Sequence, residues 1–183
     1  MNNLLLCIFV YCIILLVSPT RYLYFIPTFP IYPENTKEAL EVKQIMKNGG
    51  LYYHKLFLLT DPSVSFAFAK YVPESVSELD TMIASIKVLT PLYLLKYLIN
   101  RARPHQVSDI KPIPSKTANT PAYPSGHAYQ AYYLAKRLGN KYPDRKTQLE
   151  SLAEDCAMAR VYAGLHYPSD NQFSKTLVDK LYL

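Results

Sequence analysis

Three short clusters in the second half of the chain combine basic residues, histidines and an aspartate at spacings that suit chemistry on an anion. They are Lys96 with Arg103 and Pro104, the run Pro124-Ser125-Gly126-His127, and Arg160 followed by His166 and Asp170. Two cations near one helix end can reach the same point, and the planar fork of Arg matches two phosphate oxygens at once. Each cluster alone also has a structural interpretation, as surface cations, a structural histidine or a capping aspartate. Their combination favours an anion site.

The second cluster lies where a helix is predicted to begin. The first turn of a helix has backbone N–H groups without partners and carries a partial positive charge, so Ser125 and Gly126 can bind an anion there. Gly126 lets a ligand approach the backbone closely. His127 falls in the same turn, where a bound anion raises the pKa of the imidazole and favours its protonated form.

The third cluster predicts an oriented imidazole. If a helix begins at Pro168, Asp170 can face His166 from four positions away and accept its ring N–H. That contact fixes the tautomer and leaves the other ring nitrogen bare, as a nucleophile requires. Arg160, at the end of the preceding helix, is placed to hold the same anion.

In chain order, these clusters read K-x6-R-P, P-S-G-H and R-x5-H-x3-D, and they resemble the three-part signature of the type 2 phosphatidic acid phosphatase superfamily. That superfamily includes bacterial class A non-specific acid phosphatases, lipid phosphate phosphatases and vanadium haloperoxidases. The motifs span residues 96 to 170. The stretch AYPSGHAYQAYYLAKRL and the hydrophobic leader are most similar to the soluble acid phosphatase branch.

The resemblance implies an all-α helical bundle that hydrolyses phosphate monoesters through a phosphohistidine intermediate, with no metal or other cofactor and with vanadate as an inhibitor. His166 would be the nucleophile, Asp170 its orienting partner and His127 the general acid. The phosphoryl oxygens would be held by Lys96, Arg103, Arg160, Ser125 and the backbone N–H of Gly126. With His166 neutral and His127 charged in the free enzyme, we expect a bell-shaped pH–rate profile on the acid-to-neutral side.

Several alternatives stay open at this point. A lipid phosphate phosphatase acting at a membrane surface, a vanadate-dependent haloperoxidase and a non-catalytic phosphate-binding module could use the same pocket. The partner is accordingly a phosphorylated small molecule or a lipid phosphate. The chain has no zinc-finger spacing and no long basic block, so nucleic acid is not expected as a partner. A homo-oligomer stays open.

The residues around the motifs carry four further expectations. The family usually has Ser before the third-motif Arg, and this chain has Ala159, so we expect phosphate binding to be weaker by about 1–2 kcal/mol. Arg101 and Lys87 are predicted to face solvent. His105 is predicted to be a solvated loop residue, with contact to substrate as the alternative. The loop at 105–123 is predicted to shape substrate entry, because loops of that length are usually functional.

The elements that must position these residues are predicted to be helices. Periodic apolar residues and start signals predict helices at 36–48, 62–71 and 75–100, the last kinked by Pro91, with Gly49 and Gly50 as a stop after the first. A proline-rich loop covers 104–124, and further helices are predicted from 124 to 140, 144 to 162 and 168 to 180. We therefore expect an all-α domain of about six helices at residues 34–183.

Composition fits a single globular domain with a leader. The 183 residues are 50% hydrophobic and 19% charged, with a mean hydropathy of −0.03, as in ordinary globular proteins. After residue 20, no uncharged apolar run reaches half the length of a membrane span, which excludes a multi-span channel or transporter. A net charge of +6 favours anionic partners. The apolar run at residues 4–17 reaches only about 21 Å as a helix, against about 30 Å for a bilayer core.

We therefore interpret residues 1–20 as a signal peptide or an anchor, and residues 21–33, rich in Pro and aromatic residues, as an extended segment. The protein is expected to be exported, either secreted or periplasmic, or anchored by the N-terminal hydrophobic segment.

Overall fold

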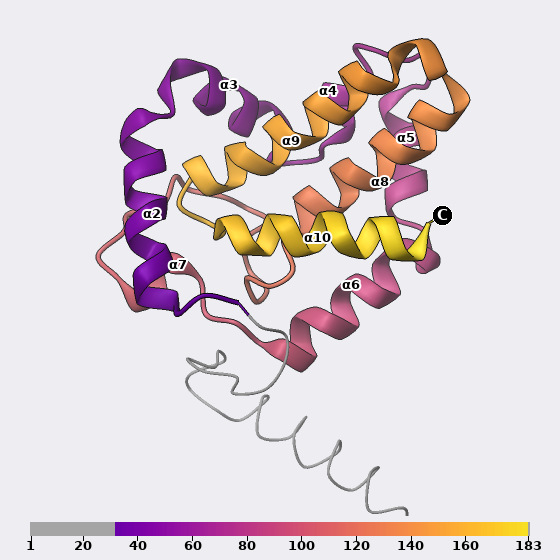
Figure 1. Cartoon of the computed structure of the whole chain (residues 1–183). Helices are drawn as coiled ribbons and strands as arrows, with labels where there is room; N and C mark the ends of the chain where they lie inside the picture. Colours follow the sequence, from indigo (N-terminus) through magenta and orange to yellow (C-terminus); the bar gives the residue numbers. More distant parts are fainter. Residues whose placement is uncertain (1–31, 183) are drawn as a thin grey trace, which may run out of the picture.

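The computed structural model describes residues 32–182, and in that range the protein is all-α, with nine α-helices, one 3-10 helix and no strand (Figure 1). The predicted leader, and the extended segment up to residue 31, lie outside the described residues. The elements are α2 (Asn35–Asn48), α3 (Gly50–Thr60), α4 (Ser65–Phe68), α5 (Val76–Ile83), α6 (Ile86–Ile99), α7 (Pro104–Val107), α8 (Gly126–Lys141), η1 (Pro143–Arg145), α9 (Lys146–Tyr162) and α10 (Pro168–Leu181).

The core forms around α8, which packs against α9 and α10, while α3 covers another side of α9 (Figure 1). Helix α8 is buried along one face because its apolar residues recur every three or four positions, at Ala128, Ala131, Ala135 and Leu138. These residues join the apolar side chains of α3, α4, α5 and α9 in one cluster. Packing of this cluster fixes the helices relative to one another, and with them the positions of the helix ends.

Most of the predicted helices are confirmed within a few residues, including those that end at Asn48 and begin at Gly126 and Pro168. The capping signal at Ser75 is confirmed in detail. The Ser75 hydroxyl accepts a hydrogen bond from the Glu78 N–H at 3.3 Å, and the Glu78 carboxylate accepts one from the Ser75 N–H at 2.8 Å. This reciprocal pair starts α5 at the next residue.

Two predicted boundaries differ. Gly49 ends α2, but Gly50 at once begins α3, a helix that the sequence did not predict. Gly50 has a φ of +64°, a left-handed conformation that allows the chain to turn a corner without a loop. The helix predicted at 62–71 is only one turn long in the structure, at α4.

The break in the long apolar segment lies before Pro91, not at it. Ser85 is extended and separates α5 from α6, whose axes differ by 53°. Pro91 lies inside α6, where it lacks the N–H that would bond to the Lys87 carbonyl; the Tyr182 hydroxyl donates to that carbonyl instead, at 2.9 Å. Within residues 32–182, no single helix has the length and hydropathy to cross a membrane, although α5 and α6 taken together do.

Four helix ends carry the predicted site residues or directly adjoin them. Asn100 ends α6 in a left-handed conformation, with its N–H bonded to the Lys96 carbonyl at 2.8 Å, and so directs the following residues into the body of the protein. The C-terminal end of α9 and the N-terminal ends of α8 and α10 complete the group. Gly164, with a φ of +72°, makes the turn between α9 and α10.

Candidate active site

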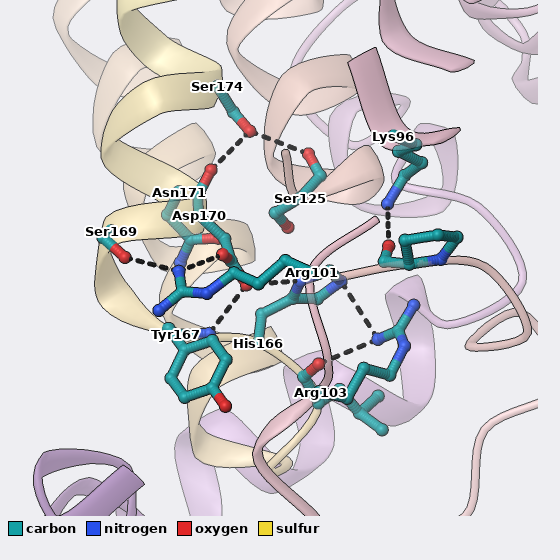
Figure 2. Close-up of polar contacts among 12 residues, drawn as sticks. Lys96, Arg101, Arg103, Ser125, His166, Tyr167, Ser169, Asp170, Asn171 and Ser174 are labelled. Carbon is teal, nitrogen blue, oxygen red and sulfur yellow. Dashed lines mark hydrogen bonds and ion pairs between the residues drawn. The ribbon is translucent and has the colours of Figure 1, made fainter. Parts of the chain in front are cut away.

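A cavity of about 330 Å³ lies at these helix ends and is lined by residues from all three sequence clusters. Five of the eight predicted site residues line it: Lys96, Arg103, Gly126, His127 and His166. The other three lie next to them. Asp170 contacts His166, Ser125 precedes Gly126, and Arg160 contacts Thr117 on the cavity wall. The structure therefore gathers the whole predicted set at one place, and Figure 2 shows part of it.

His166 is held in one orientation by Asp170. The Nδ1 atom lies 3.1 Å from Asp170 Oδ2, and because a carboxylate only accepts, Nδ1 carries the hydrogen. The bare Nε2 atom lies 3.3 Å from Arg103 Nη1 (Figure 2). Burial, followed by the charges of Arg103 and Lys96, lowers the pKa of His166 well below its usual value, so the ring is neutral.

The three predicted cations are almost fully buried, with exposed fractions of 3% for Lys96, 2% for Arg103 and 1% for Arg160. Lys96 Nζ donates to the Pro121 carbonyl at 2.7 Å, and Arg103 donates to the Thr120 and Leu165 carbonyls at 2.9 and 2.8 Å. Burial, then the charge of Arg103, lowers the pKa of Lys96 well below its usual value. Buried cations that repel one another are stabilised by an anion between them.

Two further polar groups point to a ligand. The Ser125 hydroxyl and the Nε atom of Arg160 are buried without a hydrogen-bond partner. Buried polar atoms are almost always paired in proteins. Ser125 is the N-cap of α8, yet its hydroxyl does not bond to the N–H groups of its own helix. Both groups belong to the predicted phosphate-binding set, and an oxyanion would satisfy them together with the first-turn N–H groups of α8.

His127 differs from its predicted charge state. Its Nε2 atom lies 3.0 Å from the Asp61 backbone carbonyl, to which it donates, so Nδ1 is the nitrogen without a hydrogen in the neutral ring. Burial, then the charge of Arg160, lowers the pKa of His127 to about 3. The expectation of a charged His127 in the free protein is therefore wrong, because burial and the nearby charge of Arg160 both disfavour the protonated ring.

Asp61 is a site residue that the sequence analysis missed. Its carboxylate accepts a hydrogen bond from Arg160 Nη1 at 2.8 Å and others from the Ser115 and Thr117 hydroxyls. Burial alone would raise the pKa of Asp61, but the hydrogen bonds from Ser115 and Arg160 and the charge of Arg160 hold it below its usual value. Asp61 thus ties the 105–123 loop to α9, and Thr117, Asn119 and Thr120 of that loop line the cavity. The Asp-Pro pair at 61–62 signalled only a helix start.

The other single-residue expectations have mixed outcomes. Lys87 is exposed, as predicted, and His105 is partly buried but does not line the cavity. Arg101 was expected to face solvent and is instead fully buried, because it pairs with Glu38 of α2 and Asp170 of α10. Ala159 lies in the apolar core cluster and does not line the cavity, so the expected effect on phosphate binding gains no support from the structure.

The described part of the chain therefore combines an all-α fold with a cavity that has buried cations at its wall and a neutral, oriented histidine. The model of the PAP2 superfamily matches residues 79–177, more than half of the chain, and the protein belongs to this superfamily. Members of the superfamily are generally phosphatases, which indicates a phosphatase-type activity. No curated protein matches the chain. Across residues 32–182, no group of three His, Cys, Asp or Glu side chains is placed to hold a metal ion.

Proposed function

We propose that the protein hydrolyses phosphate monoesters to orthophosphate through a phosphohistidine intermediate, without a metal, as in the class A acid phosphatase branch. The observation that supports this most strongly is the unprotonated Nε2 atom of His166, which lies at a cavity lined by buried cations. Phosphoryl transfer depends mainly on positioning and on neutralising the charge of the equatorial oxygens. Lys96, Arg103 and Arg160 supply that charge, and Ser125 and Gly126 supply hydrogen-bond donors.

In the first step, His166 Nε2 attacks phosphorus and an N–P bond forms while the ester P–O bond breaks. The electron pair of the broken bond stays on the leaving oxygen, which takes a proton from His127. The positive charge that develops on the His166 ring is stabilised by Asp170. In the second step, water attacks phosphorus, the N–P electron pair returns to Nε2, and a proton of that water passes to His127.

The proton on His127 has to arrive with the substrate. With a pKa of about 3, His127 is neutral in the free protein at pH 5 to 7. A phosphate ester with a second pKa near 6 is mostly a monoanion at pH 5, and it carries one proton into the site. Transfer of that proton to His127 gives the dianion beside an imidazolium, a pair that the dianion stabilises.

The proposal is tested by assaying purified protein with p-nitrophenyl phosphate in the presence of EDTA or vanadate. We expect hydrolysis that EDTA leaves within about twofold of its original rate, since chelators inactivate only sites that need a metal. Vanadate, a phosphate analogue, should inhibit competitively. Loss of activity with EDTA, restored by a divalent cation, would contradict the proposed site. Bromide or chloride oxidation with peroxide and vanadate, without ester hydrolysis, would favour a haloperoxidase.

The cavity also predicts a preference among leaving groups. Asp80 of α5 is the only carboxylate that lines this cavity within the described residues, and its Oδ1 atom accepts a hydrogen bond from the Ser63 hydroxyl at 2.5 Å. A second anionic group on the substrate should be repelled by Asp80, at a cost of about 1 kcal/mol for charges some 6–8 Å apart at an intermediate dielectric. The sequence analysis did not single out this residue.

Asp80→Asn should therefore raise kcat/KM for phosphoglycerate, which has a second anionic group, by about fivefold relative to glycerol phosphate, which has none. Asp144→Asn, an exposed carboxylate of η1, serves as the control and should leave this ratio unchanged. Steady-state kinetics with both substrates measure the ratio. An equal effect of Asp80→Asn on the two substrates would show that Asp80 does not select the leaving group.

A lipid phosphate phosphatase is the second candidate, favoured by the exposed apolar face of α6. Ile86, Leu94 and Leu98 on this helix are 80%, 65% and 59% exposed, and the nearby Leu92 and Tyr93 line the cavity. Such a face fits a membrane surface, as does the exported or anchored location that we expect from the N-terminal segment. Comparing phosphatidic acid in vesicles with soluble glycerol phosphate distinguishes the two candidates: a higher kcat/KM on the vesicles favours the lipid phosphatase.

A further inference from the structure

We propose that Arg101, held by Glu38, is a positioning residue that fixes Asp170 and, through it, the nucleophilic nitrogen of His166. The inference rests on the proposed function and adds a third layer of residues to the site. Neither residue lines the cavity, so neither touches substrate. Their role would be to keep the carboxylate of Asp170 in the one orientation that leaves Nε2 of His166 facing phosphorus.

Arg101 is joined to Asp170 by a short, buried ion pair. The side chains of both residues have an exposed fraction of 0%, and Arg101 Nη1 lies 2.6 Å from Asp170 Oδ1 (Figure 2). The other oxygen, Oδ2, accepts from His166 Nδ1 at 3.1 Å and from the Tyr167 N–H at 2.9 Å. Because each oxygen has its own donors, the carboxylate cannot rotate without breaking a contact. The arginine thus helps to fix the angle at which the carboxylate faces the imidazole.

The remaining nitrogens of Arg101 are anchored on the N-terminal helix of the described chain. Arg101 Nη2 lies 2.7 Å from Glu38 Oε2, and Nε donates to the Asn35 side-chain oxygen at 2.9 Å. Glu38 also accepts hydrogen bonds from the N–H and the hydroxyl of Ser169, at 2.8 and 2.7 Å. Since Ser169 directly precedes Asp170, α2 holds the carboxylate from two directions.

Aromatic rings also fix the plane of the Arg101 guanidinium group. Its central carbon lies 4.0 Å from the ring centre of Tyr32 and 3.8 Å from that of Tyr167, so two aromatic rings pack against the group. Stacking of this kind is specific to the flat guanidinium, and Lys cannot reproduce either the stacking or the fork of donors. A buried arginine held on all sides by two carboxylates and two rings is a rigid support for Asp170.

A charge count explains why Glu38 is needed. Without Glu38, Arg101 would cancel the charge of Asp170, next to a ring whose pKa is already lowered by burial and by the charges of Arg103, Lys96 and Arg160. Glu38 supplies the second carboxylate, so that Arg101 neutralises one of the two negative charges and the group retains one for Asp170 to present to His166. Groups behind a first layer of functional residues commonly change activity by about 10- to 100-fold when they are removed.

The test is Arg101→Lys, compared with Glu38→Gln and with Lys43→Gln as the matched control. Lys43 is also on α2 and pairs with Asp109 at the surface, so its replacement removes an ion pair that does not reach Asp170. Vanadate titration gives the number of competent sites in each preparation, and kcat is expressed per competent site. This normalisation removes any loss that comes only from unfolded protein.

For Arg101→Lys, we expect kcat per site to fall about 10- to 100-fold while KM and vanadate affinity change by less than about threefold, because the phosphate-binding cations are intact. Glu38→Gln should lower kcat per site by about threefold or more, and Lys43→Gln should have no effect. An unchanged kcat per site in Arg101→Lys would overturn the inference and leave a purely structural role.

If Arg101→Lys does not fold, Glu38→Gln decides the question by the same criterion, and an unchanged kcat per site overturns the inference. Failure of the proposed function would give a different result from failure of this inference: the unmodified protein would bind vanadate but would hydrolyse no phosphate ester.

Discussion

Replacing His166 by Ala is expected to reduce kcat for phosphate ester hydrolysis by at least about 10³-fold, since removing a nucleophile costs on the order of 10³- to 10⁶-fold. The variant should still bind vanadate or phosphate, because Lys96, Arg103 and Arg160 are unchanged. Steady-state kinetics and vanadate binding, measured on the same preparation, separate the two effects.

His105→Ala is the control for this prediction. His105 is a partly buried histidine on α7, close in sequence to Arg103, but it does not line the cavity. We expect its replacement to change kcat by less than about threefold, in the range of substitutions that touch no reacting group. Residual turnover near the original level in His166→Ala would show that the nucleophile is a different residue or a water molecule.

Replacing His127 by Ala should give a loss that depends on the leaving group. An alkoxide leaves poorly without a proton, so kcat for glycerol phosphate should fall by about 10²- to 10⁴-fold. The p-nitrophenolate ion leaves readily without one, so kcat for p-nitrophenyl phosphate should fall by less than about tenfold. Gln130→Ala, one helical turn further along α8 and also on the cavity wall, is the matched control and should affect both substrates equally.

The same assignment sets the direction of the pH dependence. With a pKa of about 3, His127 is neutral above about pH 4, and the pKa of His166 is also lowered well below its usual value, so His127 gains no catalytic proton in the free protein as the pH falls from 7 to 5. The proton comes with the substrate monoanion, so kcat/KM should be level near pH 5 and fall about tenfold per pH unit above a substrate pKa near 6.

Two esters with different second pKa values identify the titrating group. The falling limb of kcat/KM should move with the substrate, because the proton is carried in by the ester and not by the free protein. A limb that stays at the same pH for both esters would assign the titration to the protein and contradict a neutral His127. Equal losses for both leaving groups in His127→Ala would contradict its role as the general acid.

Some features of the site could be predicted from the sequence because each depends on residues only a few positions apart in the chain. The four-residue spacing of His166 and Asp170 gives their contact once α10 begins at Pro168, and Ser125-Gly126 at a helix start gives the anion-binding N–H groups. The capping pair at Ser75 and Glu78 is another local feature, and it was predicted correctly.

The features that the sequence analysis missed depend on contacts between residues far apart in the chain. Arg101 and Arg103 are two positions apart in one segment and both are buried, but one contacts Glu38 on α2 and the other lines the cavity. The motif spacing singled out Arg103, but nothing in the segment itself shows that Arg101 is buried, because the carboxylate of Glu38 that pairs with it is 63 positions away. Asp61 was missed for the same reason, since its partner Arg160 is 99 positions away. Pairings between remote segments are fixed only when the helices pack.

The central claim is that His166 becomes phosphorylated during turnover, and it can be tested by trapping that species. The protein is mixed with ³²P-labelled substrate, quenched in alkali within the first turnovers, and digested for peptide mapping. We expect an alkali-stable, acid-labile label on the peptide that contains His166, absent from His166→Ala. Steady turnover by the unmodified protein with no such label, or with the label on another residue, would contradict the phosphohistidine mechanism.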